Sequence, residues 1–232
     1  MSNTHVPFLG KRLLICVAHP DDESFAAAGT MHENRKRGGK TFVACATLGE
    51  KGKSHLARPI SDAELKRIRK GELLAASRFL GVSKVYMLGM PDGKLRFHPE
   101  MLFRKTLAFA KKVKPDFILG FGADGISGHT DHITVGRAAK RAAHRLKVPY
   151  VAFALSPRFA DDATSWLKQR RRHGHYRRSI AFRTPNTTVP INARVKKRAL
   201  RFHKSQMDGP RFAGFPKYAA RELLRAEHFF IK

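Results

Sequence analysis

A short segment near the N-terminus combines residue types that bind metal ions. HPDDE at residues 19–23 places one imidazole and three carboxylates directly after an apolar stretch. Neighbouring carboxylates repel one another, and a divalent cation relieves that repulsion. His19 and Asp22 are three residues apart across a turn that Pro20 stiffens, so both can reach one ion. An ordinary helix start, whose first turn favours acids, explains one or two carboxylates but not His19 beside Asp21 and Asp22.

A second segment, GHTDH at residues 128–132, offers the ligand that the first one lacks. His129 and His132 are three residues apart and therefore share a face if the segment is helical. Taken alone, such a pair is more often incidental than a metal site. Together with His19 and Asp22 it gives two histidines and one carboxylate, which leave metal positions open for water and substrate. The sequence therefore predicts a catalytic rather than a structural metal site.

The two motifs follow apolar segments that we interpret as strands of one sheet. We expect buried strands at residues 11–18, 41–47, 85–88, 117–120 and 150–154, and helices at residues 24–37, 61–80, 100–113 and 131–146. Regular alternation with mostly short connections is typical of an α/β fold: a Rossmann-like, open and mostly parallel sheet with helices on both faces. Ligands of such sheets bind at the carboxyl ends of the strands, which is where both motifs fall.

Beyond residue 154 this alternation weakens. We expect short strands within residues 179–191 and helices at residues 195–206 and 218–228. We interpret residues 1–232 as a single domain in which about residues 155–232 form a variable C-terminal part. Its densest basic stretch, KQRRRHGHYRR at residues 168–178, either shapes substrate choice, contacts a polyanion or is a solvated basic surface.

The charge balance is extreme, with 46 Lys and Arg against 18 Asp and Glu and a formal net charge of +28. Such a charge attracts polyanions, although a solvated basic surface without any partner explains it equally well. Because no DNA-reading motif is present, we expect nonspecific association at most. The 42% of hydrophobic residues excludes wholesale disorder.

Two features indicate the compartment. Cys16 and Cys45 each lie in an apolar stretch, which favours reduced core thiols over a disulfide. No apolar run approaches the roughly 20 residues that a membrane-spanning helix needs. We therefore expect a cytoplasmic protein without a membrane span.

Both motifs resemble the signatures of the LmbE-like, or PIG-L, family of zinc-dependent deacetylases, which remove the acetyl group from substrates that contain N-acetylglucosamine. Further segments agree with the family in order: TLGEKG at residues 47–52, Arg69 with Glu72, LGMPDG at residues 88–93, HKSQ at residues 203–206 and EHF at residues 227–229. The resemblance covers nearly the whole chain. It implies Zn²⁺ as the cofactor, a glycoconjugate as the substrate and a homo-oligomeric assembly.

The resemblance also implies a role for each residue of the two motifs. His19, Asp22 and His132 would hold the metal, and Asp21 would act as the general base and later as the acid. His129, as a cationic imidazole, would polarise the carbonyl and stabilise the oxyanion.

Three residues outside this set receive roles from the same resemblance. Asp131 would orient a metal-binding histidine, while Arg69 and Asp92 would contact the substrate. His203 would lie near the site, without an assigned role.

One alternative keeps the metal and changes the chemistry. Two histidines and one carboxylate also describe non-haem iron oxygenases, so Fe²⁺ stays the alternative to Zn²⁺. The adjacent Asp21 and the family resemblance favour hydrolysis. The particular sugar conjugate is left open, and the basic surface favours an anionic one.

Overall fold

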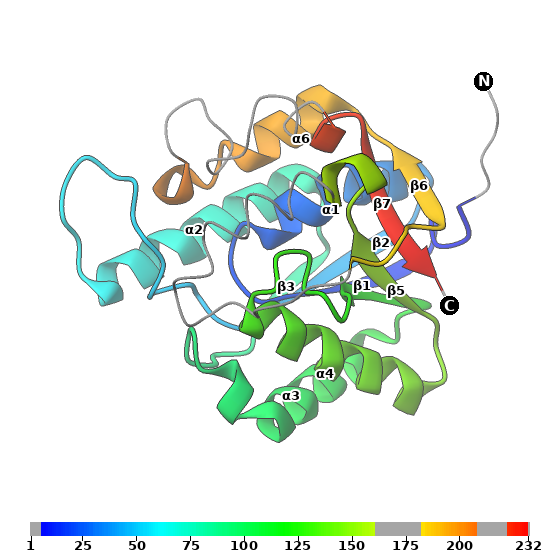
Figure 1. The fold of residues 1–232 in the computed structure, drawn as a ribbon, viewed down its shortest axis with the longest axis horizontal. Coiled ribbons are helices and arrows are strands. Elements are labelled where there is room, and N and C mark those ends of the chain that lie inside the picture. The colour runs from blue at the N-terminus through cyan, green and yellow to red at the C-terminus, as the bar shows by residue number, and fades with distance from the viewer. Residues whose placement is uncertain (1–5, 161–181, 208–221, 232) are drawn as a thin grey trace.

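A seven-stranded sheet forms the centre of the molecule (Figure 1). The structure, a computed structural model, describes residues 6–160, 182–207 and 222–231. The strands are β1 (Arg12–Val17), β2 (Lys40–Cys45), β3 (Lys84–Met87), β4 (Phe117–Phe121), β5 (Tyr150–Ala154), β6 (Thr187–Pro190) and β7 (Ala226–Ile231).

The strand order is β3-β2-β1-β4-β5-β7-β6. The first five strands in this order pair in parallel, whereas β7 is antiparallel to both β5 and β6. The chain order reverses between β1 and β4, so the loops that follow these two neighbouring strands leave the sheet in different directions. Such a switch point is where an open α/β sheet binds its ligands, and the predicted fold class is confirmed.

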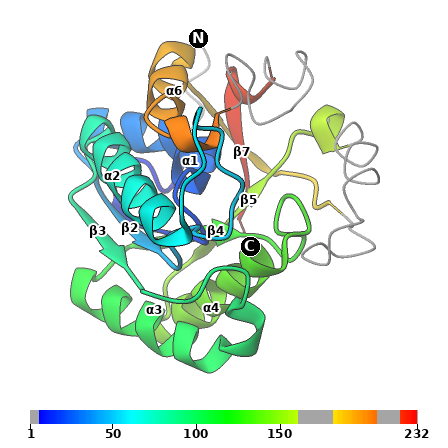
Figure 2. The same cartoon turned by 90° about the vertical axis from the view of Figure 1, so that its left-hand side faces the viewer.

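Helices cover both faces of the sheet (Figures 1 and 2). The structure has α1 (Asp22–Lys36), α2 (Asp62–Leu80) and α6 (Ala193–Leu200) on one face, and α3 (Pro99–Val113) and α4 (Thr130–Leu146) on the other. Two short 3-10 helices are η1 (Leu95–Phe97) and η2 (Lys204–Gln206).

The central strands are apolar on both sides because helices cover both sides. Leu13, Leu14 and Ile15 of β1 are completely buried. Cys16 and Cys45 are buried and free, as the sequence predicts, and burial raises the pKa of the Cys16 thiol to about 12. Both thiols therefore pack as small core side chains.

The C-terminal part differs from two predictions. The helix expected at residues 195–206 ends at Leu200, and the chain turns before η2 begins at Lys204. Within the helix expected at residues 218–228, Glu222 and Leu223 are helical, but the prediction is wrong from Ala226, which begins β7. Alternate residues of β7 are buried against β5, so pairing across the sheet outweighs local helix preference.

The structure bears on two further expectations. Within the described residues no helix is both long and apolar enough to cross a membrane. The basic stretch at residues 168–178 lies outside the described residues.

Candidate active site

The turn between β1 and α1 brings His19 and Asp22 together. The Asp22 carboxylate accepts hydrogen bonds from the backbone N–H groups of Ala18 (3.1 Å) and His19 (2.8 Å). These bonds fold the side chain of Asp22 back over the turn. As a result His19 Nδ1 lies 3.5 Å from Asp22 Oδ2.

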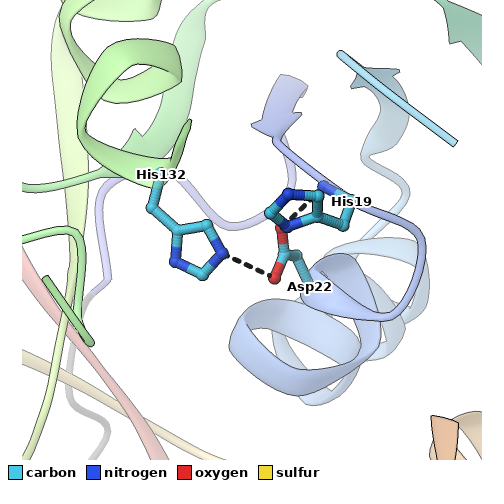
Figure 3. A group of neighbouring side chains, drawn as sticks. All are labelled: His19, Asp22 and His132. Atoms are coloured by element: carbon cyan, nitrogen blue, oxygen red, sulfur yellow. Dashed lines mark hydrogen bonds and ion pairs between the residues drawn. The ribbon is translucent and has the colours of Figure 1, made fainter. Parts of the chain in front are cut away.

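His132 approaches from the other side of the switch point, on the first turn of α4 (Figure 3). Its Nε2 lies 3.3 Å from Asp22 Oδ1. Its Nδ1 lies 2.9 Å from the carbonyl oxygen of Gly125, and its ring stacks on Phe121 at 4.1 Å between centroids. Because Nδ1 faces that carbonyl, Nε2 is the ring nitrogen that faces Asp22.

These three residues fit a divalent metal ion. One ligand atom from each of His19, Asp22 and His132 lies within 4.8 Å of the others. Imidazole nitrogens with one carboxylate oxygen are a donor set that zinc and other transition metals prefer. Burial alone would raise the pKa of Asp22, but the charges of His132 and His19 hold it well below its usual range, so the carboxylate is ionised.

A second group of three, His19, His129 and Asp131, also has one ligand atom from each residue within 4.8 Å of the others. Its members are engaged elsewhere. His129 Nδ1 accepts the backbone N–H of Asp131 at 3.2 Å, and the Asp131 carboxylate accepts those of Gly93 (2.8 Å) and Leu95 (3.3 Å). The group that contains Asp22 and His132 is therefore the better metal site.

Two carboxylates lie near Nε2 of His19, on the side of the ring away from Asp22. His19 Nε2 lies 3.1 Å from Asp92 Oδ1 and 3.6 Å from Asp131 Oδ2. Burial would lower the pKa of His19, but hydrogen bonds to Asp131, Asp22 and Asp92 raise it well above its usual value. A carboxylate on the far nitrogen of a metal-binding histidine fixes the ring and its tautomer, which leaves Nδ1 for the metal.

Asp92 contacts protein groups with both oxygens. Besides His19, it accepts hydrogen bonds from Thr47 Oγ1 (3.3 Å) and the backbone N–H of Lys51 (2.9 Å). These contacts make Asp92 a support for His19, and the substrate contact that the resemblance implies for it stays a prediction.

Arg69 is likewise turned inward and is only 3% exposed. Its guanidinium donates to the carbonyls of Gly49 (2.9 Å) and Pro20 (2.5 Å) and lies 3.2 Å from Asp21 Oδ2. A Cβ at Gly49 would lie 2.1 Å from Arg69 Nη1, so the close approach requires a glycine. Arg69 therefore contacts the predicted base, and the substrate contact that the resemblance implies for it stays a prediction.

Asp21 lies at the edge of the metal group, with 31% of its side chain exposed. Desolvation raises the pKa of Asp21 to about 6, and the charge of Asp22 adds to this, while Arg69 opposes it. A carboxylate with a pKa near the working pH suits proton transfer.

His129 is the N-cap of α4. Since its Nδ1 accepts the N–H of Asp131, the proton sits on Nε2. Burial, followed by the charges of His132 and His19, lowers the pKa of His129 to about 3. The structure therefore favours a neutral imidazole over the cationic one that we expect from the sequence. A neutral Nε2–H still donates to a developing oxyanion.

Glu23, Ser24 and His203 form a buried group behind the turn that the sequence analysis missed. His203 Nε2 lies 2.9 Å from Glu23 Oε1, although the two residues are 180 positions apart. The only signal in the sequence was that both belong to segments resembling the family.

The sequence matches a known family in the region that builds this site. The family model described as PIG-L, GlcNAc-PI de-N-acetylase, matches residues 14–143. The fold and the site place the chain among α/β proteins with a histidine–carboxylate metal centre at the sheet edge, and the chain belongs to the PIG-L family.

Relatives of this chain carry names of sugar-conjugate deacetylases. A probable N-acetyl-alpha-D-glucosaminyl L-malate deacetylase 2 of Bacillus subtilis is 34% identical over 139 residues, which are 59% of this chain and 62% of the relative. The chain thus spans about three fifths of the length of that relative. A 1D-myo-inositol 2-acetamido-2-deoxy-alpha-D-glucopyranoside deacetylase of Thermomonospora curvata is 30% identical, over 88% of this chain and 84% of the relative.

Solved structures share the fold. N,N'-diacetylchitobiose deacetylase from Pyrococcus horikoshii superposes with a TM-score of 0.68 at 24% identity, covering 96% of this chain and 84% of its own. GalB from Pseudomonas putida, a 4-carboxy-2-hydroxymuconate hydratase, has a TM-score of 0.63 at 19% identity and covers 95% of both chains. Because one fold carries two chemistries, the reaction must be argued from the site.

Proposed function

We propose that this chain is a metal-dependent amide hydrolase that removes the acetyl group from an N-acetylglucosamine conjugate. The observation that carries the proposal is the partly exposed carboxylate of Asp21 directly beside the group of His19, Asp22 and His132. Family membership and the names of the relatives support the same reaction.

The side chains divide the work of amide hydrolysis. His19, Asp22 and His132 hold the metal, for which we propose Zn²⁺. A bound zinc ion acidifies water and polarises the acetyl carbonyl. Asp21 takes the proton from the attacking water and returns it to the leaving amine. His129 donates its Nε2–H to the carbonyl oxygen as negative charge develops there.

Metal analysis combined with acetate release tests this function. Wild type and Asp21→Asn would be assayed on N-acetylglucosamine linked to malate, to inositol and to a second N-acetylglucosamine. We expect equal metal content in both proteins and acetate release by wild type alone. Acetate release by Asp21→Asn at the wild-type rate would exclude Asp21 as the base. Activity that is lost in chelator and restored by Zn²⁺ without oxygen separates hydrolysis from iron oxygenation.

A second proposal concerns the net charge of +28. The outer faces of α3 and α4 are exposed and strongly basic, and Glu100 is their one exposed acid, held by Arg141 at 2.5 Å. Helical spacing aligns the cations of this α3–α4 basic face: Arg104, Lys105, Lys111, Lys112, Arg137, Lys140, Arg141 and Arg145. We propose that it associates with polyanions without sequence preference.

Salt dependence tests the second proposal. Binding to a 20-base-pair DNA should fall steeply between about 50 and 200 mM salt, as it does when lysines and arginines neutralise phosphates. The double variant Lys140→Glu with Arg145→Glu should weaken binding more than the matched pair Lys66→Glu with Lys70→Glu, which lies on α2 across the sheet. Equal weakening would mean that the net charge of the whole protein attracts the DNA and that the α3–α4 basic face is not a specific binding site.

Three further expectations concern the whole chain. We propose a homo-oligomer, and the exposure of Phe97 (63%) and Met101 (51%) near the start of α3 supports an apolar contact there. Light scattering of wild type and Phe97→Ser tests this. The single domain over residues 1–232 and the cytoplasmic location stay predictions.

A further inference from the structure

We propose that Glu23 and His203 are positioning residues that hold the backbone of Asp21 in the conformation from which it acts as the base. This inference rests on the proposed function, because it takes Asp21 to be the base. It adds a role for a C-terminal residue, His203, that lies outside the family match at residues 14–143.

The backbone of Asp21 has an unusual conformation, with φ 103° and ψ −33°. A residue with a side chain rarely adopts such a φ, and holding it costs about 1–3 kcal/mol. Asp21 sits at the N-cap of α1, yet its side chain makes no capping hydrogen bond. The carboxylate is therefore not held by its own helix, and other contacts must fix the residue.

Two hydrogen bonds hold the peptide group between Pro20 and Asp21, one to its carbonyl oxygen and one from its N–H. The Pro20 carbonyl accepts a hydrogen bond from Arg69 Nη2 at 2.5 Å. The Asp21 N–H donates to Glu23 Oε2 at 3.0 Å. With its oxygen and its hydrogen both engaged, this peptide plane is fixed, and so is the direction in which the Asp21 side chain leaves the backbone.

Glu23 in turn is held by groups that solvent does not reach. Its Oε1 accepts from Ser24 Oγ at 2.6 Å and contacts His203 Nε2 at 2.9 Å. Glu23 and Ser24 are fully buried and His203 is 1% exposed. Leaving a buried carboxylate without one of its partners costs free energy, so the side chain shifts towards another donor. Removing His203 would therefore weaken the hydrogen bond that Glu23 accepts from the Asp21 N–H.

The geometry of His203 allows matched variants. Its Nε2 makes the contact with Glu23, whereas its Nδ1 has no hydrogen-bond partner. A glutamine amide reaches the position of Nε2, and an asparagine amide reaches only that of Nδ1. His203→Gln therefore keeps a donor to Glu23, and His203→Asn removes it, while both variants are neutral.

Steady-state kinetics and metal analysis on the full-length protein form the first test. We expect His203→Asn to lower kcat about 10- to 100-fold with unchanged KM and metal content, since small misplacements of a reacting group have effects of this size. His203→Gln should retain most of kcat. Folded and metal-loaded His203→Asn with wild-type kcat would overturn the proposal.

Hydrogen exchange of the Asp21 amide is the second test and does not depend on activity. The amide should exchange slowly in wild type and His203→Gln and at least about 10-fold faster in His203→Asn, because the bond to Glu23 is weakened. Equal protection in all three proteins would overturn the positioning role. An inactive wild type with this exchange pattern would refute the proposed function and leave the positioning contact intact.

A matched control separates positioning from general loosening. Lys196 and Glu227 form another buried pair in the C-terminal part, 2.8 Å apart, and Glu227 accepts from the backbone of α1 at Gly29 and Thr30. The double variant Lys196→Met with Glu227→Gln should change the unfolding midpoint but not kcat. If it lowers kcat as much as His203→Asn does, loosening explains both effects and the proposal fails.

Discussion

Two neighbouring carboxylates, Asp22 and Glu23, begin two histidine–carboxylate clusters with different properties. The open cluster of His19, Asp22 and His132 has side chains that are 11–14% exposed. The closed cluster of Glu23 and His203 is essentially inaccessible, with side chains at most 1% exposed. The residue types are alike, so composition does not distinguish a metal site from an internal support. A metal site is distinguished from an internal support by its solvent access and by the remaining partners of its carboxylate.

The helix separates the two clusters. Consecutive residues of α1 point about 100° apart, because a turn takes 3.6 residues. Asp22 therefore faces α4 across the switch point, while Glu23 faces the segment after α6. Asp22 faces histidine nitrogens that a metal can use, whereas Glu23 is surrounded by protein donors on both oxygens.

The largest effect should come from the open cluster. Asp22→Asn keeps the shape of the side chain but removes its charge, so the metal should be lost. Loss of a single oxyanion donor typically lowers the rate about 100- to 1,000-fold, and we expect the loss of activity in Asp22→Asn to be larger than that. Glu23→Gln should retain its metal. Elemental analysis and acetate release measure both variants. Full metal content in Asp22→Asn would contradict the assignment of the open cluster as the metal site.

The next effect concerns His129, which borders the open cluster without holding the metal. His129→Asn retains an acceptor for the N–H of Asp131 at the start of α4 but loses the Nε2–H donor. We expect kcat to fall about 100- to 1,000-fold while the metal stays bound. Unfolding in urea should change little. A variant with wild-type kcat would remove His129 from the reaction.

The buried pair of Lys196 and Glu227 should affect stability alone. Lys196→Met leaves the carboxylate of Glu227 buried without its cation, so the free energy of unfolding should fall by about 3–5 kcal/mol. Adding Glu227→Gln removes the buried charge but should recover only part of this loss, because the amide has one acceptor oxygen for the two backbone N–H groups of Gly29 and Thr30. Urea denaturation and metal analysis measure the two effects separately. Loss of metal in folded Lys196→Met would show that the C-terminal part and the open cluster are coupled.

The smallest effect is a pH dependence of the closed cluster. Burial alone would lower the pKa of His203, but the charge of Glu23 and the hydrogen bond to it raise that pKa above 6.5. A raised pKa in the folded state stabilises the protein fully below pH 6.5, and this contribution is lost as the pH rises through the folded-state pKa. The difference in unfolding free energy between wild type and His203→Gln should therefore shrink from about pH 5 to about pH 9. A difference that grows with pH would contradict a charged His203.

The metal group was predictable because its information is local. His19 and Asp22 share one turn, His132 opens the helix after β4, and the rule for parallel sheets brings both segments to one edge. The supporting residues were not predictable in the same way. The polar atoms of Asp92 and Arg69 contact His19 and Asp21, and sequence spacing does not report such contacts.

By itself, the sequence determined the alternation of strands and helices, the sheet edge where the chemistry lies and the donor atoms for a metal. Hydrophobic periodicity and short spacings carry that information. Only the tertiary structure decided that residues 226–228 form a strand instead of a helix, that burial lowers the pKa of His129 and that His203 reaches Glu23. The physical reason is that strand pairing, desolvation and contacts between distant segments depend on what surrounds a residue in space, which its neighbours along the chain do not specify.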